Sequence, residues 1–155
     1  MLGSVLVRPA FLHDNGIRLF VHRLKYAAAS PIPEPLIAAM VSRVPVGTTA
    51  LVPVPRSVLR RLRYGVDPAL ELARAVGRET GIPVIEVLAV PFLRPSQARR
   101  GRSGRRYPSL RAVRPLTPGA IVVDDVVTTG RTLRSASEAL GSVTTAVTLT
   151  TSSWG

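Results

Sequence analysis

The sequence contains no cysteine, a single lysine and no long apolar run. Without cysteine there can be no disulfide and no zinc site with thiolate ligands. No apolar stretch reaches the roughly 18–20 residues that a membrane span requires, and the first residues lack the basic, apolar and small-residue succession of a secretion signal. We therefore expect a cytoplasmic protein. Its 155 residues suffice for one domain with a sheet and helices on both faces.

Acidic residues are scarce and unevenly distributed. Nine acids oppose 21 basic residues, so the net charge is +12. No acid lies between Glu86 and Asp124, and that interval holds these arginines: Arg94, Arg99, Arg100, Arg102, Arg105, Arg106, Arg111 and Arg114. Such a block repels itself and attracts polyanions such as pyrophosphate, nucleotides or nucleic acid. Residues 94–108, which have no apolar period, are predicted to form a mobile basic loop.

Strand and helix patterns alternate along the chain. Apolar residues at helical spacing predict helices over 17–29, 35–44, 67–81 and 130–140. Strands are expected over 49–54, 82–90, 120–123 and 144–150. Residues 1–16 show no clear period and receive no assignment. The alternation predicts a single α/β domain over residues 1–155, with a doubly wound, mainly parallel sheet and helices on both faces.

The most informative segment is Ile121-Val-Val-Asp-Asp-Val-Val-Thr-Thr-Gly-Arg-Thr-Leu133. Its β-branched start is typical of a buried strand, and two carboxylates follow at the expected carboxyl end. The hydroxyl residues and glycine after them precede a helix, where free N–H groups and the positive end of the helix dipole attract phosphate. The carboxylates can accept hydrogen bonds from vicinal sugar hydroxyls or hold the water shell of Mg²⁺. Phosphate, diol and metal together describe a phosphorylated ribose.

This segment resembles, position by position, the signature with which type I phosphoribosyltransferases bind phosphoribosyl pyrophosphate (PRPP). The resemblance implies the fold of that family and a site for PRPP, or for ribose 5-phosphate, with Mg²⁺. The implied ligand-binding residues are Asp124, Asp125, Val126, Thr128, Thr129, Gly130, Arg131 and Thr132. Both acids are implied as catalytic and as holding Mg²⁺ through water. The alternative for this segment is a solvated strand end with an acidic turn.

Phosphoribosyl transfer also requires donors for the pyrophosphate and closure over the sugar. The turn Val54-Pro55-Arg56 follows a predicted strand and precedes further arginines, so we interpret it as a pyrophosphate loop, with an ordinary proline turn as the alternative. The basic loop is the expected lid, because lids come from weakly packed segments and can deliver arginine to a leaving group. Its functional residues are predicted to be Gln97, Arg99, Arg102 and Arg105, the last of them catalytic.

Several of these segments together resemble the ComF family, phosphoribosyltransferase-like proteins associated with bacterial competence. The resembling segments are Pro53-Val-Pro55, the arginine-rich turn into Asp67-Pro-Ala-Leu-Glu-Leu-Ala73, Leu93-Arg94, and Gln97 with Arg105. The similarity extends from about Ile17 to Leu149. Three features depart from the family: the cysteine-rich zinc module is missing, Arg63-Tyr-Gly-Val-Asp67 stands where Arg-Gly-Phe-Asn-Gln is common, and Pro108 stands where an asparagine is common.

Two functional hypotheses follow. One is the transfer of phosphoribose from PRPP to a nitrogenous acceptor, with release of pyrophosphate. The alternative is a non-catalytic accessory in competence or DNA uptake, which senses PRPP or binds single-stranded nucleic acid through the arginine-rich loop. Thr128 stands where 6-oxopurine phosphoribosyltransferases carry an acidic proton acceptor, and a hydroxyl cannot accept that proton near neutral pH, which disfavours hypoxanthine and guanine. No residue pattern identifies the acceptor base, and the sequence is compatible with a homodimer.

Overall fold

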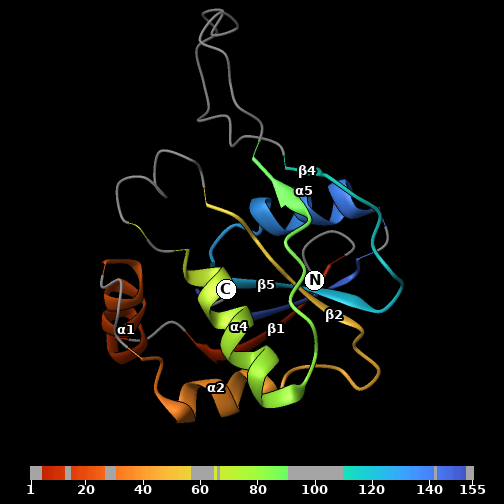
Figure 1. Cartoon of the computed structure of the whole chain (residues 1–155). Coiled ribbons are helices and arrows are strands. Elements are labelled where there is room, and N and C mark those ends of the chain that lie inside the picture. The colour runs from red at the N-terminus through yellow and green to blue at the C-terminus, as the bar shows by residue number, and fades with distance from the viewer. Residues whose placement is uncertain are drawn as a thin grey trace, which may run out of the picture.

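The structure is a computed structural model that describes residues 5–12, 15–26, 31–56, 65, 67–90, 110–141 and 143–152. The elements are β1 (Leu6–Leu12), α1 (Asn15–Tyr26), α2 (Glu34–Val41), β2 (Ala50–Pro53), α4 (Pro68–Thr80), β3 (Leu88–Ala89), β4 (Arg111–Ala112), β5 (Ala120–Val127), α5 (Arg131–Leu140) and β6 (Thr145–Thr151). Four strands form an all-parallel sheet in the order β1-β6-β5-β2, and β3 pairs with β4 in an antiparallel pair (Figure 1).

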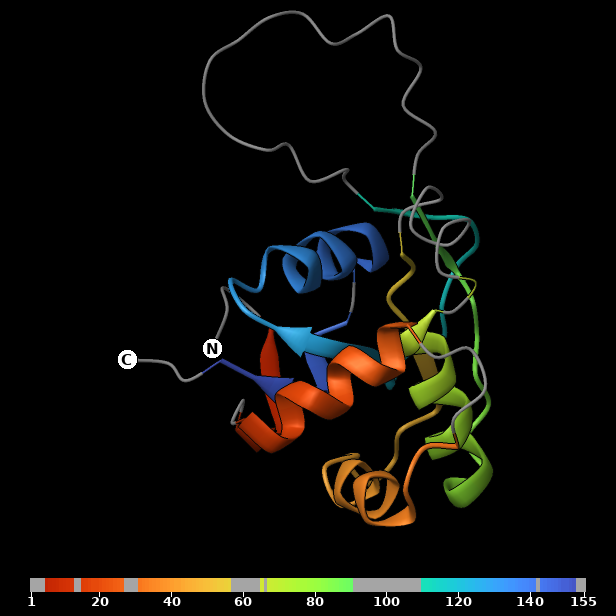
Figure 2. The same cartoon turned by 90° about the vertical axis from the view of Figure 1, so that its left-hand side faces the viewer.

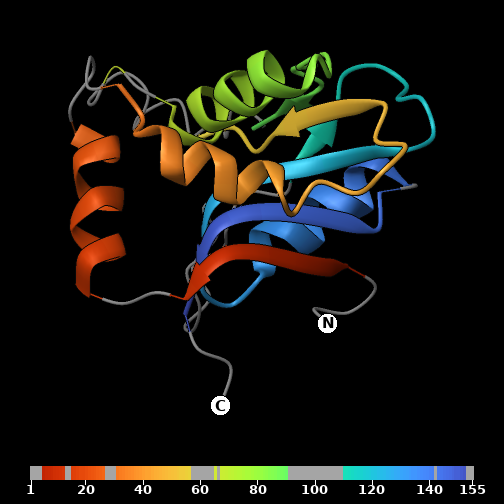
Figure 3. The ribbon, with the colours of Figure 1, turned by 90° about the horizontal axis from the view of Figure 1, so that it is seen from below.

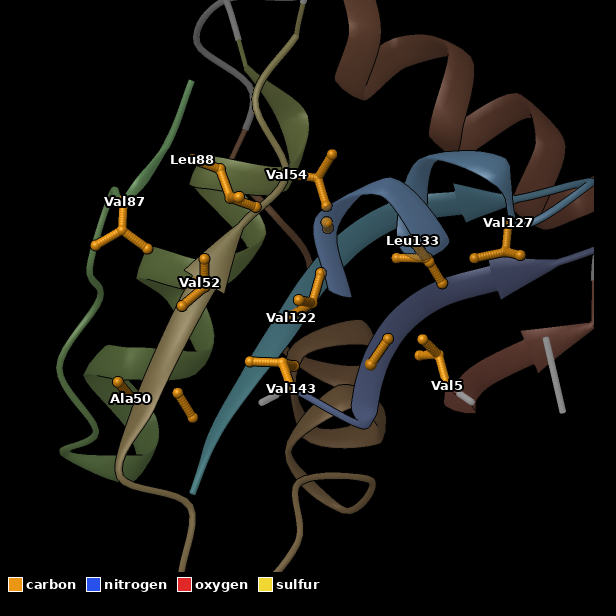
Figure 4. Close-up of a cluster of buried hydrophobic side chains, with 13 residues drawn as sticks. Val5, Ala50, Val52, Val54, Val87, Leu88, Val122, Val127, Leu133 and Val143 are labelled. Carbon is orange, nitrogen blue, oxygen red and sulfur yellow. The ribbon is translucent and has the colours of Figure 1, made fainter. Parts of the chain in front are cut away.

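One face of the parallel sheet is covered by α5 (Figure 2). This helix buries Leu133 and Ala136 in a cluster that also contains Val52, Val122 and Val127 (Figure 4). Because these side chains come from β2, β5 and α5, their burial holds the helix over the centre of the sheet.

The opposite face is covered by α2 and α4, and α1 lies past the carboxyl ends of the strands (Figure 3). Val21, Met40 and Leu72 of these helices belong to a second buried cluster, which includes Ile121 of β5 and Leu149 of β6. Strands buried on both faces are continuously apolar rather than alternating, which explains the β-branched start of β5. The predicted α/β architecture, with a parallel sheet and helices on both faces, is confirmed.

The predicted helices are confirmed, with ends shifted by three residues at most. The helix α4 begins at Pro68 with Asp67 in the N-cap position, and it ends before Gly81, whose φ of 73° is left-handed. Among the described residues, no helix combines the length and the hydropathy that crossing a bilayer requires. The predicted loop at 94–108 lies outside the described residues.

Two strand predictions need correction, and one strand lies in the region that received no assignment. The unassigned amino-terminal region contains β1, which tolerates Pro9 because it lies at the edge of the sheet. The strand predicted at 120–123 continues to Val127, so both acids lie inside β5 rather than after it. Pairing with β6 as far as Thr151 extends the strand through these carboxylates.

The strand predicted at 82–90 is mostly absent. Val84 forms one isolated parallel bridge to Leu51, and only Leu88–Ala89 is a strand. The N–H of Leu51 donates to Pro83 O at 2.9 Å, and the N–H of Ile85 donates to Leu51 O at 2.9 Å. The chain then leaves the sheet edge and pairs with β4 instead.

Candidate functional site

The carboxyl ends of β2, β5 and β6 meet at one edge of the sheet. Because these strands are parallel and adjacent, the loops that follow them lie next to one another, which is where ligands bind in open α/β sheets. Pro53 pairs with Val123, and the N–H of Val54 donates to Val123 O at 3.0 Å. The turn after β2 therefore starts beside the strand segment that carries Asp124.

A hollow of about 90 Å³ lies between the end of β5 and the start of α5. One water molecule requires roughly 10–15 Å³, so the hollow has room for a polyatomic anion. Its walls are Asp124, Val126, Val127, Thr128, Thr129, Gly130, Thr132 and Leu133. Most of the predicted ligand-binding residues are thus brought together. Asp125 and Arg131 are not among the wall residues, and Arg131 is exposed.

The amino-terminus of α5 opens onto this hollow. Gly130 occupies the N-cap with φ 66° and ψ 6°, a left-handed conformation that favours glycine. No side chain caps the helix, and its first turn contains no acidic residue. The first N–H groups of a helix lack partners within the helix, and the helix dipole adds positive potential there. This end of α5 therefore favours an anion in the hollow.

The two acids differ in their surroundings. Asp124 is 8% exposed, and its Oδ1 accepts the N–H of Asp125 at 2.8 Å. Asp125 is half-buried, and its Oδ1 accepts the N–H of Val126 at 2.9 Å. Both carboxylates are thus tied to the backbone of the next residue. Asp124 is the one that contributes to the wall of the hollow.

A buried hydroxyl accompanies Asp124 on the neighbouring strand. Thr148 is its register partner on β6 and is fully buried. Among the described residues, Thr148 Oγ1 has no hydrogen-bond partner. Sequence reasoning did not select Thr148, because a threonine inside a strand pattern is ordinary and only the register brings it beside the carboxylate.

The predicted pyrophosphate turn is fixed at both ends. Val54 is buried against β5, while Pro55 and Arg56 are half-buried. The N–H of Arg56 donates to Asp67 Oδ2 at 3.1 Å. Asp67 occupies the N-cap of α4, but its carboxylate makes no capping bond to that helix. Its contact with Arg56 was not predicted.

The residues predicted for the lid, Gln97, Arg99, Arg102 and Arg105, lie outside the described residues. The described chain resumes at Leu110, whose N–H donates to Ser135 Oγ of α5 at 2.8 Å. This bond holds Leu110 against the helix whose first turn borders the hollow.

The predicted Mg²⁺ fits these residues only if the bound phosphate compound supplies some of the oxygens that coordinate the ion. Within the part of the chain that the structure describes, no three His, Cys, Asp or Glu side chains lie close enough to enclose an ion. Mg²⁺ usually keeps several waters and binds one or two carboxylates together with substrate phosphate oxygens. Asp124, in the wall of the hollow, is a carboxylate that could share an ion with such a ligand.

No protein-family model, curated protein or solved structure matches this chain.

Proposed function

We propose that this protein binds PRPP with Mg²⁺ and transfers its phosphoribosyl group to a nitrogenous acceptor. One observation carries the proposal: the hollow at the uncapped amino-terminus of α5 shares its wall with the carboxylate of Asp124. An anion site next to a hydrogen-bond acceptor for hydroxyl groups is what a phosphorylated sugar requires.

Each part of the ligand has a corresponding region. The 5′-phosphate occupies the hollow, where Thr128, Thr129 and Thr132 supply hydroxyls beside the helix N–H groups. The ribose hydroxyls donate to Asp124. The pyrophosphate lies toward Arg56, on the turn that starts beside the same strand. The hollow, Asp124 and Arg56 thus follow one another in the same order as the 5′-phosphate, the ribose and the pyrophosphate of PRPP.

The reaction forms a bond from the acceptor nitrogen to C1 of the ribose and breaks the bond from C1 to the pyrophosphate oxygen. The bonding electrons leave with the pyrophosphate, and the acceptor loses its proton to solvent. The charge of the leaving group is balanced by Arg56 and by the predicted lid residues Arg99, Arg102 and Arg105. Bound Mg²⁺ supplies further neutralisation of the pyrophosphate, and Asp124 and Asp125 are the residues that would hold it through water.

A second candidate is a non-catalytic protein that binds single-stranded nucleic acid or senses PRPP. It is favoured by a group of exposed arginines on β4, on the loop after it and on α5, which packs against β4: Arg111, Arg114, Arg131 and Arg134. Further arginines stand in the sequence between positions 94 and 106. Such a surface favours polyanions longer than one pyrophosphate.

A thermal-shift screen separates the two candidates. The parent protein is heated with PRPP and MgCl₂, with PRPP alone, with ribose 5-phosphate, and with a single-stranded oligonucleotide. The proposal predicts a rise in Tm with PRPP that is larger when Mg²⁺ is present, since a ligand of the folded state stabilises it by mass action. A rise with the oligonucleotide alone, and none with PRPP, would favour the second candidate.

A further inference from the structure

In the turn after β2, residues 53–56, few backbone N–H groups are available to a ligand. Pro53 and Pro55 have no N–H. The N–H of Val54 donates to Val123 O, and the N–H of Arg56 donates to the carboxylate of Asp67 at 3.1 Å. Both backbone N–H groups of 53–56 are therefore bound within the protein. A pyrophosphate at this turn would therefore need a side-chain donor, and Arg56 is the basic residue among 53–56.

Asp67 is held firmly in place. It is 8% exposed, and the three residues after it, Pro68, Ala69 and Leu70, are buried. The helix they begin, α4, packs against β5 and β2. A hydrogen bond from an N–H to an ionised carboxylate is roughly twice as strong as one between neutral groups. The carboxylate therefore connects the backbone of Arg56 to the rigid part of the fold.

The usual task of an aspartate in this position is different. An N-cap aspartate accepts an N–H from the first turn of its own helix. Asp67 has N-cap geometry, with φ −110° and ψ 100°, and forms no such bond. Its Oδ2 accepts an N–H that lies 11 residues earlier in the chain. The side chain thus supports the turn after β2 in place of capping α4.

We infer that Asp67 is a positioning residue for pyrophosphate recognition. It fixes the backbone from which the Arg56 guanidinium extends, and it does so apart from the hollow at α5. The inference rests on the proposed function and adds that binding of the pyrophosphate and binding of the 5′-phosphate depend on different residues. Loss of the Asp67 bond should impair ligands that carry pyrophosphate and spare those that carry only the 5′-phosphate.

Isothermal titration calorimetry with MgCl₂ and three probes tests this: PRPP, inorganic pyrophosphate and ribose 5-phosphate. Asp67→Ala removes the acceptor, and we expect about tenfold weaker binding of PRPP and pyrophosphate, with ribose 5-phosphate changed by less than about twofold. Asp67→Asn keeps an oxygen acceptor and should retain most of the PRPP affinity. Glu79→Ala removes the same charge from an exposed position of α4 and should leave all three affinities unchanged.

The outcomes that would overturn the inference are distinct from those that would overturn the proposed function. A parent protein that binds neither ribose 5-phosphate nor PRPP contradicts the proposed function, and the role of Asp67 falls with it. A parent that binds both, with a folded Asp67→Ala variant that also binds both normally, contradicts only the role of Asp67. An equal loss of both ligands contradicts it as well, because the separation is then missing.

Amide hydrogen exchange tests the bond even where Asp67→Ala does not fold. In the parent and in Asp67→Asn, the Arg56 amide should exchange more slowly than an unprotected amide, because its hydrogen is bonded to a buried group. Exchange of the parent's Arg56 amide at the unprotected rate would overturn the inference without any substitution.

Discussion

Asp124 and Thr148 lie opposite each other on the parallel strands β5 and β6, and both side chains are buried. Strands in a sheet lie about 4.8 Å apart, and paired residues point to the same face. The carboxylate in the wall of the hollow therefore has a hydroxyl as its neighbour. Asp124 is the residue proposed to accept the ribose hydroxyls, so this pair joins that part of the proposed site to the interior of the sheet.

Thr148→Val tests what this hydroxyl does. Among the described residues, Thr148 Oγ1 has no hydrogen-bond partner, and a buried hydroxyl without a partner costs about 1–3 kcal/mol. Valine keeps the shape and suits a strand, so we expect the free energy of unfolding in urea to rise by about 1 kcal/mol. A clear loss of stability would show instead that the hydroxyl is bonded, for example to a buried water next to Asp124.

Gly130→Val tests the anion hollow. Gly130 has φ 66°, which is strongly disfavoured for a β-branched residue, and the added side chain would crowd the wall of the hollow. We expect calorimetry to show no binding of ribose 5-phosphate.

Gly141→Val is the matched control. Gly141 has φ 70° at the other end of the same helix, and nothing lies within 4 Å of an added Cβ. This variant should lose about 1–2 kcal/mol of stability through the same backbone strain and still bind ribose 5-phosphate normally. Normal binding by a folded Gly130→Val variant would show that the phosphate lies elsewhere.

Local patterns predicted most of the sheet and most of the hollow. The hollow is predictable because residues 126–132 are contiguous, so one motif contains the loop, the glycine and the helix start. β1 was missed because Arg8 and Pro9 interrupt its apolar residues. The extension of β5 through both acids was missed because aspartate is disfavoured in strands, and pairing with β6 overrides that preference.

The contacts that sequence reasoning missed join residues distant in the chain. The local sequence at Asp67 is that of a helix N-cap, and its bond to the N–H of Arg56 depends on the fold. Thr148 is selected only by the register between β5 and β6. Neither the order of strands in the sheet nor their register can be read from a local pattern, so these supporting residues require the structure.

Gly77→Ala tests how tightly α4 packs against the chain that follows it. Alanine normally stabilises a helix interior by about 1 kcal/mol relative to glycine. At Gly77 an added Cβ would lie 2.9 Å from Ile82 O and 3.0 Å from Val84 Cγ2. The segment cannot easily withdraw, because Pro83 O accepts the N–H of Leu51 in the sheet.

We therefore expect Gly77→Ala to lower the free energy of unfolding by about 1–3 kcal/mol, as overpacking does. Arg78→Ala, at the exposed neighbouring position, should change it by less than about 0.5 kcal/mol. Chemical denaturation of both variants provides the comparison. A stabilised Gly77→Ala variant would contradict the packing described for α4.

The triple substitution Arg99→Ala, Arg102→Ala and Arg105→Ala separates a lid from a nucleic-acid surface. If these residues close over the sugar, turnover with an accepted base should fall and the affinity for single-stranded DNA should barely change. If they follow a nucleic-acid backbone, log affinity falls with log salt at about −0.7 per phosphate contact, and the triple variant flattens this slope by about 2. We expect the first result. A collapsed salt slope, with no PRPP binding by the parent, would support the nucleic-acid function.

The most direct test is calorimetric titration of PRPP with MgCl₂ into the parent protein and into the variant Asp124→Asn with Asp125→Asn. A PRPP site at the carboxyl end of this sheet predicts measurable binding by the parent. It also predicts at least about tenfold weaker binding by the double variant, because hydrogen bonds to charged groups contribute about 1.5–3 kcal/mol each. Circular dichroism should show that both proteins are folded. Equal affinities in two folded proteins, or no binding by the parent, would show that the carboxyl end of this sheet is not a PRPP site.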